Sequence, residues 1–93
     1  MNYFEKNKKM DKIKLKLKEQ IIEQLNLESV SVSDIADDMP LFGEGLGLDS
    51  IDALELIVLM ENHYHIKLVN PEEGKSVFQS INTMADYIAK HKN

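Results

Sequence analysis

The sequence predicts an all-α fold, a four-helix bundle with a long loop between the first two helices and a short third helix. Two observations lead to this fold class. Aromatic residues make up only 6% of the chain and Trp is absent, so the core must be built from aliphatic side chains, which favours packed helices over a sheet sandwich. Apolar residues also recur at the three- and four-residue spacing of amphipathic helices. The chain of 93 residues fits one small domain.

The first helix is predicted from Met10 to about residues 26–27. Residues 1–8 are polar and are expected to form a flexible N-terminus, which leaves 9–93 as the folded domain. Leu15 lies off the apolar stripe of this helix. The stripe itself consists of Met10, Ile13, Leu17, Ile21 and Leu25.

Residues 28–49 are expected to form a long connection, and a connection of this length usually serves a function. Ser33 is expected to cap a short turn, which Pro40 ends. Several apolar residues in the second half of the connection are expected to hold it against the core. They are Leu41, Phe42, Leu46 and Leu48.

The second helix is predicted from about Ser50 to Tyr64. Asp49 is a favourable N-cap, and Asp52 three positions later suits a capping box. Residues 66–69 form a short segment with β-branched residues at both ends, and we expect this segment to be extended.

Asn70 and Pro71 predict the start of the short third helix, because they suit the N-cap and the first helical position. Gly74 weakens this helix, which is expected to end near residues 78–79. The last helix is predicted over about residues 82–91.

The second helix has two apolar faces when it is drawn on a helical wheel. The face predicted to enter the core contains Ala53, Leu56, Ile57, Met60 and Tyr64. The opposite face contains Ile51, Leu54 and Val58. Full burial of both faces is not expected in a small domain, and acidic residues surround the outer face. We therefore interpret the outer face as a docking surface for partner proteins.

The distribution of charge limits the possible partners. Residues 1–18 hold seven Lys and two acidic residues, a net charge of +5, whereas residues 19–93 hold four Lys and fourteen acidic residues, a net charge of −10. An acidic body argues against nucleic acid and favours partners with basic docking surfaces. The Lys-rich first helix is interpreted as a solvated face, with anionic lipid or an acidic partner as alternatives.

Several classes of protein are disfavoured by residues that the sequence lacks. Without Cys there is no disulfide and no thiolate chemistry. No apolar run is long enough to span a bilayer and no signal peptide is present, so a soluble, cytoplasmic protein without stable membrane insertion is expected.

No metal centre and no enzyme activity are expected either. His63 and His65 lie close to Glu61 in sequence, but a convincing set of metal ligands is missing. The sequence contains no nucleophile–base pair and no glycine-rich motif that would bind phosphate.

Ser50 stands out because it opens the second helix, directly after a glycine-punctuated loop. A serine at a helix start is usually only a cap. Free N–H groups and the dipole at a helix N-terminus would also stabilise an anion attached there. The acidic neighbours disfavour a reversibly bound phosphate, which leaves a covalently attached group as the functional interpretation.

The stretch Gly47-Leu48-Asp49-Ser50-Ile51-Asp52-Ala53-Leu54-Glu55-Leu56 resembles the 4′-phosphopantetheine attachment site of acyl carrier proteins. The core of that site is Asp-Ser-Leu, followed by Asp, a small or apolar residue, and Glu-Leu. Ile51 replaces the usual Leu. Residues 20–25 and 82–88 resemble parts of the first and last helices of the family, so the resemblance covers about residues 10–90.

The resemblance implies that Ser50 carries 4′-phosphopantetheine, derived from coenzyme A. The thiol of this cofactor would hold acyl intermediates as thioesters for fatty acid or related lipid or polyketide biosynthesis. The implied partners are a phosphopantetheinyl transferase, acyltransferases, ketosynthases and other acyl-processing enzymes, which visit a monomeric carrier. The residues that match the recognition surface of the family are Asp49, Ile51, Asp52, Leu54, Glu55, Val58 and Glu61.

An acyl chain is expected to fold back between the second helix and the short third helix. The residues expected to line this cleft are Leu46, Leu56, Leu59, Ile66, Met84 and Ile88. Two alternatives stay open at this point. One is a peptidyl or D-alanyl carrier, and the other is a helical interaction module in which Ser50 is an unmodified cap.

Overall fold

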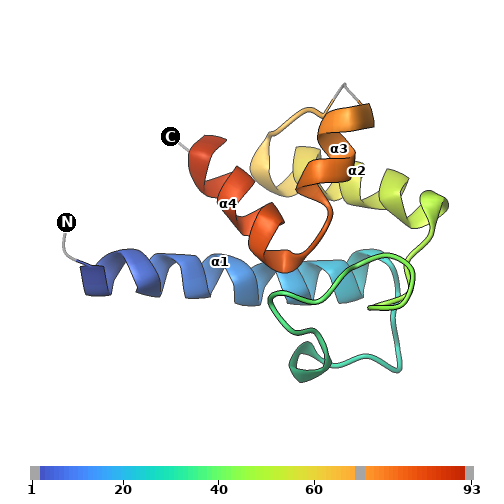
Figure 1. Cartoon of the computed structure of the whole chain (residues 1–93), viewed down its shortest axis with the longest axis horizontal. Coiled ribbons are helices and arrows are strands. Elements are labelled where there is room, and N and C mark those ends of the chain that lie inside the picture. Colours follow the sequence, from blue (N-terminus) through green and yellow to red (C-terminus); the bar gives the residue numbers. More distant parts are fainter. Residues whose placement is uncertain (1–2, 69–70, 92–93) are drawn as a thin grey trace.

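The computed structural model describes residues 3–68 and 71–91. Within these ranges the helices are α1 (Tyr3–Gln24), α2 (Ser50–Tyr64), α3 (Pro71–Val77) and α4 (Ile81–His91), with a 3₁₀ turn at Val32–Asp34. Helices α2, α3 and α4 all lie on one side of α1, and the long connection from α1 to α2 loops around the C-terminal end of α1 (Figure 1). The predicted all-α bundle with a long first loop and a short third helix is confirmed.

The core is aliphatic, as the composition predicted, and is formed mainly where α1, α2 and α4 meet. Residues on all three helices are removed completely or almost completely from solvent, and they include Leu17, Ile21, Leu56, Leu59, Met84 and Ile88. The connection before α2 also reaches the core, because Leu41 and Leu48 are buried and Phe42 and Leu46 pack against the buried cluster. The expectation that these four residues hold the loop to the core is confirmed.

The first helix begins at Tyr3, earlier than the predicted start at Met10. It therefore runs through the boundary expected between residues 8 and 9. The reason is that residues 3–9 contain no Gly or Pro and are rich in Lys and other residues compatible with a helix, so polarity alone does not stop the helix there. Leu15, which lies off the apolar stripe, is 50% exposed.

The end of α1 also differs slightly from the prediction, at Gln24 rather than near residues 26–27. Asn26 adopts a left-handed conformation with φ 55°. The N–H of Leu27 then donates to the carbonyl of Ile22 at 2.9 Å. Asn tolerates this conformation better than most residues, and the resulting bonds close the helix end.

A turn is present at residues 37–38, before Pro40 as expected, but the predicted cap at Ser33 is wrong. Ser33 does not cap a turn after it but lies inside the 3₁₀ turn Val32–Asp34. The carboxylate of Asp34 accepts hydrogen bonds from the backbone N–H and the hydroxyl of Ser31, at 2.9 and 3.1 Å. These bonds lower the pKa of Asp34, and they hold the turn two residues earlier than a cap at Ser33 would.

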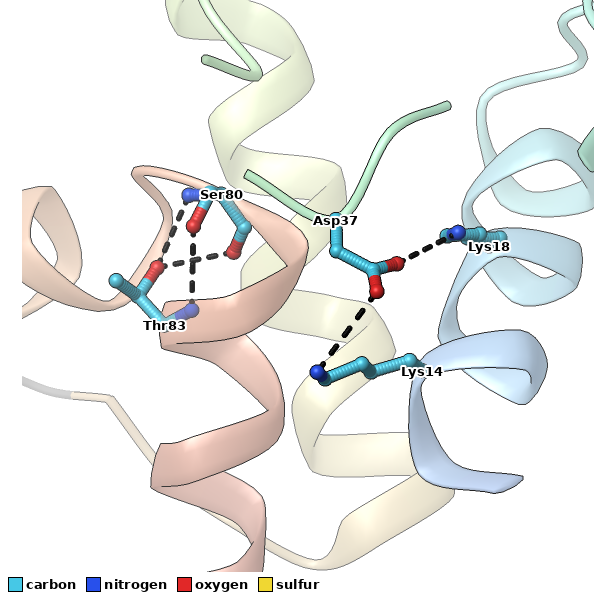
Figure 2. A network of polar contacts seen from close by, with 5 residues as sticks. All are labelled: Lys14, Lys18, Asp37, Ser80 and Thr83. Carbon is cyan, nitrogen blue, oxygen red and sulfur yellow. Dashed lines mark hydrogen bonds and ion pairs between the residues drawn. The ribbon is translucent and has the colours of Figure 1, made fainter. Parts of the chain in front are cut away.

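Asp37 joins the connection to two helices, and Figure 2 shows its contacts with the first of them. Its carboxylate lies 2.7 Å from the Nζ of Lys18 and 3.8 Å from the Nζ of Lys14, both on α1. The hydrogen bond from Lys18 lowers the pKa of Asp37, with a smaller contribution from Lys14. The carbonyl of Asp37 accepts from the N–H of Asn82 on α4 at 2.9 Å. The lysines of α1 are therefore used in part to fix the loop.

Helix α4 begins at Ile81, one residue before the predicted start, because Ser80 and Thr83 cap it reciprocally (Figure 2). The N–H of Ser80 donates to the Thr83 hydroxyl at 2.9 Å, and the N–H of Thr83 donates to the Ser80 hydroxyl at 3.2 Å. The Thr83 hydroxyl also donates to the carbonyl of Val77 at 2.7 Å. This capping box joins the end of α3 to the start of α4.

Helix α2 has the predicted bounds, and His65 closes it in a left-handed conformation with φ 56°. The hydroxyl of Tyr64 donates to Oε1 of Gln20 on α1 at 2.6 Å, and burial raises the pKa of Tyr64. Residues 65–68 form neither helix nor strand, and Val69, the last residue of the segment expected to be extended, lies outside the described residues. Pro71 is the first residue of α3, as predicted, whereas the expected cap Asn70 lies outside the described residues.

Candidate functional site

Ser50 is exposed and is the first residue of α2. Asp49 is the N-cap, and its Oδ1 accepts hydrogen bonds from the N–H groups of Ile51 and Asp52 at 3.0 and 3.1 Å. In return, Oδ2 of Asp52 accepts from the N–H of Asp49 at 2.9 Å. The predicted capping box is confirmed, and Ser50 is exposed at the helix start that this box closes.

This cap corrects one sequence expectation about Ser50. We expected free N–H groups at the helix start to stabilise an attached anion, but those of Ile51 and Asp52 are occupied by the Asp49 carboxylate. A carboxylate two residues away in the same chain competes more effectively than an external anion. The arrangement therefore offers an exposed hydroxyl for covalent attachment and a poor reversible phosphate site.

The loop before Ser50 is fixed by backbone hydrogen bonds. The N–H of Leu46 donates to the carbonyl of Pro40 at 2.9 Å, and the N–H of Leu48 donates to the carbonyl of Leu41 at 3.0 Å. The N–H of Leu41 in turn donates to the carbonyl of Gln79, between α3 and α4, at 3.0 Å. These bonds give the glycine-punctuated stretch a defined conformation, and they connect the residue before it to the segment between α3 and α4.

A cavity of about 960 Å³ adjoins Ser50. One wall is formed by α2, where Ser50, Ala53, Leu54 and Ile57 line the cavity, and Leu54 also belongs to the exposed outer face, so that face borders the cavity. The opposite wall comes from α3 and the residues after it. The rest of the lining consists of Asp38, Pro40, Phe42 and Leu68. The lining is mainly apolar, so the cavity suits an apolar group that is attached at the rim.

The six residues predicted to line an acyl cleft lie elsewhere. Five of them are buried in the core, and Leu46 is partly buried against it. None of the six lines the cavity beside Ser50. The cavity lies between α2 and α3, where an acyl cleft was expected, and its lining differs from the six residues named for that cleft. Helical periodicity identified the core-facing side chains, and it does not separate a packed core from a hollow beside it.

Sequence reasoning missed the lining residues on this side of the cavity, notably Gly74 and Lys75 of α3 and Phe78 directly after it. It also missed Phe42 in this role, although two of the three Phe residues of the chain line the cavity. No motif marks these positions. The one available signal was Gly74, a glycine inside a short helix, which we interpreted only as a helix-weakening residue.

The outer face of α2 is exposed, as predicted. The exposed fraction is 69% for Ile51, 62% for Leu54 and 41% for Val58. Asp49 and Glu61 are exposed beside them, and Asp52 is half-buried. Glu55 is also half-buried, and its carboxylate accepts a hydrogen bond from Nε2 of Gln24 on α1 at 2.9 Å. The sequence did not predict this bond.

Among the described residues, no group of three or more His, Cys, Asp or Glu side chains is arranged to hold a metal ion. His63 and His65 are both exposed near the end of α2. Within residues 3–68 and 71–91, no helix combines the length and hydropathy needed to cross a membrane.

A comparison with protein families agrees with the geometry of the site. The family model for the phosphopantetheine attachment site matches residues 16–88, which is most of the chain and includes the start of α2 and the cavity. Domains of this family act as carriers by means of 4′-phosphopantetheine that is bound to them covalently. The chain therefore belongs to the phosphopantetheine-attachment family of carrier domains.

Proposed function

We propose that Ser50 is the residue that carries 4′-phosphopantetheine, and that the protein carries acyl intermediates as thioesters on this arm. The observation that carries the proposal is the position of Ser50. Its hydroxyl is exposed at the first turn of α2, and the residue also belongs to the rim of the cavity. A group attached there is accessible to other enzymes and has an apolar hollow beside it.

The fit of the cofactor is supported by the surroundings of Ser50. The carboxylate of Asp49 accepts from the N–H groups of Ile51 and Asp52, and the carboxylate of Asp52 accepts from the N–H of Asp49. The Ser50 hydroxyl takes no part in these bonds and is left for attachment. The cofactor would supply the thiol that the chain lacks, because the sequence contains no Cys. The residues of the chain would then hold the arm, shelter its cargo and present it to partners.

The outer face of α2 supports docking of partner enzymes. Its exposed apolar side chains, Ile51, Leu54 and Val58, lie among acidic residues, which suits a partner with a basic rim around an apolar centre. A phosphopantetheinyl transferase and the acyl-processing enzymes of fatty acid, lipid or polyketide synthesis would use this surface. We propose that the carrier works as a monomer in the cytoplasm.

The apolar lining of the cavity favours an acyl cargo over the amino acid of a peptidyl or D-alanyl carrier. Polar and charged cargo would lose hydration on entering such a space. This lining is the observation that supports the acyl carrier over the alternative.

The test is incubation of the protein with coenzyme A and a phosphopantetheinyl transferase of broad specificity, followed by intact mass measurement. We expect the addition of one phosphopantetheine, complete loss of this addition in Ser50→Ala, and normal addition in the control Ser76→Ala, which removes an exposed serine of α3. No addition to the wild-type chain with several active transferases would contradict the carrier function. Mass analysis of the thioester on protein from its own host then identifies the cargo.

A further inference from the structure

The chain has four glycines, and three of them are required by the loop before Ser50. A Cβ at Gly45 would lie 1.7 Å from the carbonyl oxygen of Pro40, which no rearrangement of a side chain relieves. Gly43 and Gly47 have φ angles of +68° and +86°, which other residues rarely adopt.

Gly74 is explained neither by a backbone clash nor by a positive φ angle. It lies inside α3 without a positive φ. Among the described atoms, those nearest to a Cβ built there are Cε2 and Cδ2 of the Phe78 ring, at 3.8 and 4.0 Å, which is ordinary van der Waals contact. Outside α3 itself, no backbone atom of the described residues is as close to this position as the Phe78 ring. Alanine would therefore fit the folded chain and would favour the helix, whereas glycine weakens it.

What Gly74 does provide is room in the cavity. It is buried, and it lines the cavity together with Phe78, which directly follows α3 and donates its N–H to the carbonyl of Gly74 at 2.9 Å. A Cβ would take up space beside the ring of Phe78, in the wall opposite Ala53 and Ile57 of α2. Ser50 belongs to the same cavity, so this space can be reached by a group attached there.

We propose that Gly74 determines how much of an apolar acyl chain the cavity accepts between α2 and α3. This inference rests on the proposed function, since the chain has to be attached through Ser50. A medium-length aliphatic acyl group buries its methylene groups against the apolar lining, and each methylene removed from water stabilises the enclosed state. A side chain at position 74 occupies part of that space, so the acyl group spends more time outside, where its thioester is accessible to nucleophiles.

The experiment compares octanoyl and acetyl thioesters, loaded from the corresponding coenzyme A derivatives. Hydroxylamine attacks the thioester carbonyl, forms the hydroxamate and releases the cofactor thiol, and mass spectrometry follows the loss of the acyl group. Acetyl serves as an internal control because it has almost no methylene surface to enclose. The measured quantity is the ratio of the octanoyl half-life to the acetyl half-life.

We expect the wild-type ratio to be well above one and Gly74→Ala to lower it by about fivefold or more, which corresponds to the lower end of the cost of overpacking an apolar site. Gly74→Leu is expected to lower it further. Ser76→Ala is the matched control, because it strengthens the same helix at an exposed position outside the cavity lining and leaves the ratio unchanged. Adding Phe78→Leu to Gly74→Ala removes ring volume beside the new methyl group, and we expect it to restore the ratio in part.

The outcomes separate the two proposals. If the wild-type chain accepts no phosphopantetheine, the proposed function fails. If the wild-type protein is loaded but its ratio is close to one, or if Gly74→Ala leaves the ratio unchanged, the inference about Gly74 is overturned and the carrier function stands. An equal decrease in Ser76→Ala also overturns it, because the effect would then come from the rigidity of α3 rather than from space.

Discussion

The two sides of the bundle are built differently. Where α1 meets α2 and α4, side chains such as Leu17, Ile21 and Met84 have no exposed surface, and Asp37 ties the loop to both α1 and α4. Between α2 and α3 the chain leaves a cavity of about 960 Å³, and the helix on its far side has seven residues with a glycine in the middle.

This difference indicates a division of work within a small domain. A domain of this size has a small free energy of unfolding. It can therefore contain a large cavity only if its other side chains pack closely. The packed side supplies the stability, and the open side is free to accept a cargo. The predictions below test whether the two sides respond differently to substitution.

The largest effect on stability is expected for Leu17→Ala on the packed side. Leu17 has no exposed surface, so the substitution removes buried methyl groups and leaves a void, which costs about 3 kcal/mol in the free energy of unfolding. Urea denaturation followed by circular dichroism measures the loss. The control is Leu15→Ala, which removes the same atoms from a half-exposed position on the same helix. Equal losses for the two variants would show that the packed side is not the source of stability.

A smaller, purely functional effect is expected for Ile51→Ala on the outer face of α2. Ile51 is 69% exposed and does not line the cavity, so the free energy of unfolding should change by less than about 0.5 kcal/mol. Loss of an apolar docking contact is expected to lower kcat/KM of the phosphopantetheinyl transferase about tenfold. Leu15→Ala again serves as the control, because it is exposed on α1, away from the docking surface. An unchanged kcat/KM for Ile51→Ala would exclude this residue from docking.

The smallest effect is expected for Asp37→Asn, which removes the ion pairs with Lys14 and Lys18. The pairs are partly exposed, so we expect a loss of about 0.5 to 1 kcal/mol at neutral pH. The folded state lowers the pKa of Asp37 below its ordinary value of 3.8. The stabilisation is therefore present above that value and is lost as the pH falls through the lower pKa of the folded state.

Urea denaturation at pH 7 and at about pH 2 tests this sign, because the difference between wild type and Asp37→Asn should shrink in acid. Asp38→Asn is the matched control, since Asp38 is the exposed neighbour of Asp37. A difference that grows in acid would contradict the assignment.

Much of the fold could be predicted from the sequence, because it depends on local signals. The capping box of Asp49 and Asp52 and the proline at the start of α3 placed their helices correctly. The outer face of α2 was also predicted, since three apolar residues on the far side of one helix have no partner in a domain of this size.

The residues around the cavity could not be predicted in the same way. Helical periodicity says that Leu56 and Ile57 both face inward, yet Leu56 packs in the core and Ile57 lines the hollow. That distinction depends on where α3 lies relative to α2, which no local pattern encodes. The bond between Gln24 and Glu55 was missed for the same reason, because it joins residues far apart in the sequence.

That bond bears on how a docking partner would meet Glu55. The carboxylate accepts from the amide of Gln24 through Oε2 at 2.9 Å, which holds the side chain in one position. A carboxylate has two oxygens and several acceptor positions, so an incoming Lys or Arg would add a hydrogen bond to a group that is already ordered. In the proposed docking, less side-chain freedom would then be lost on binding at this position.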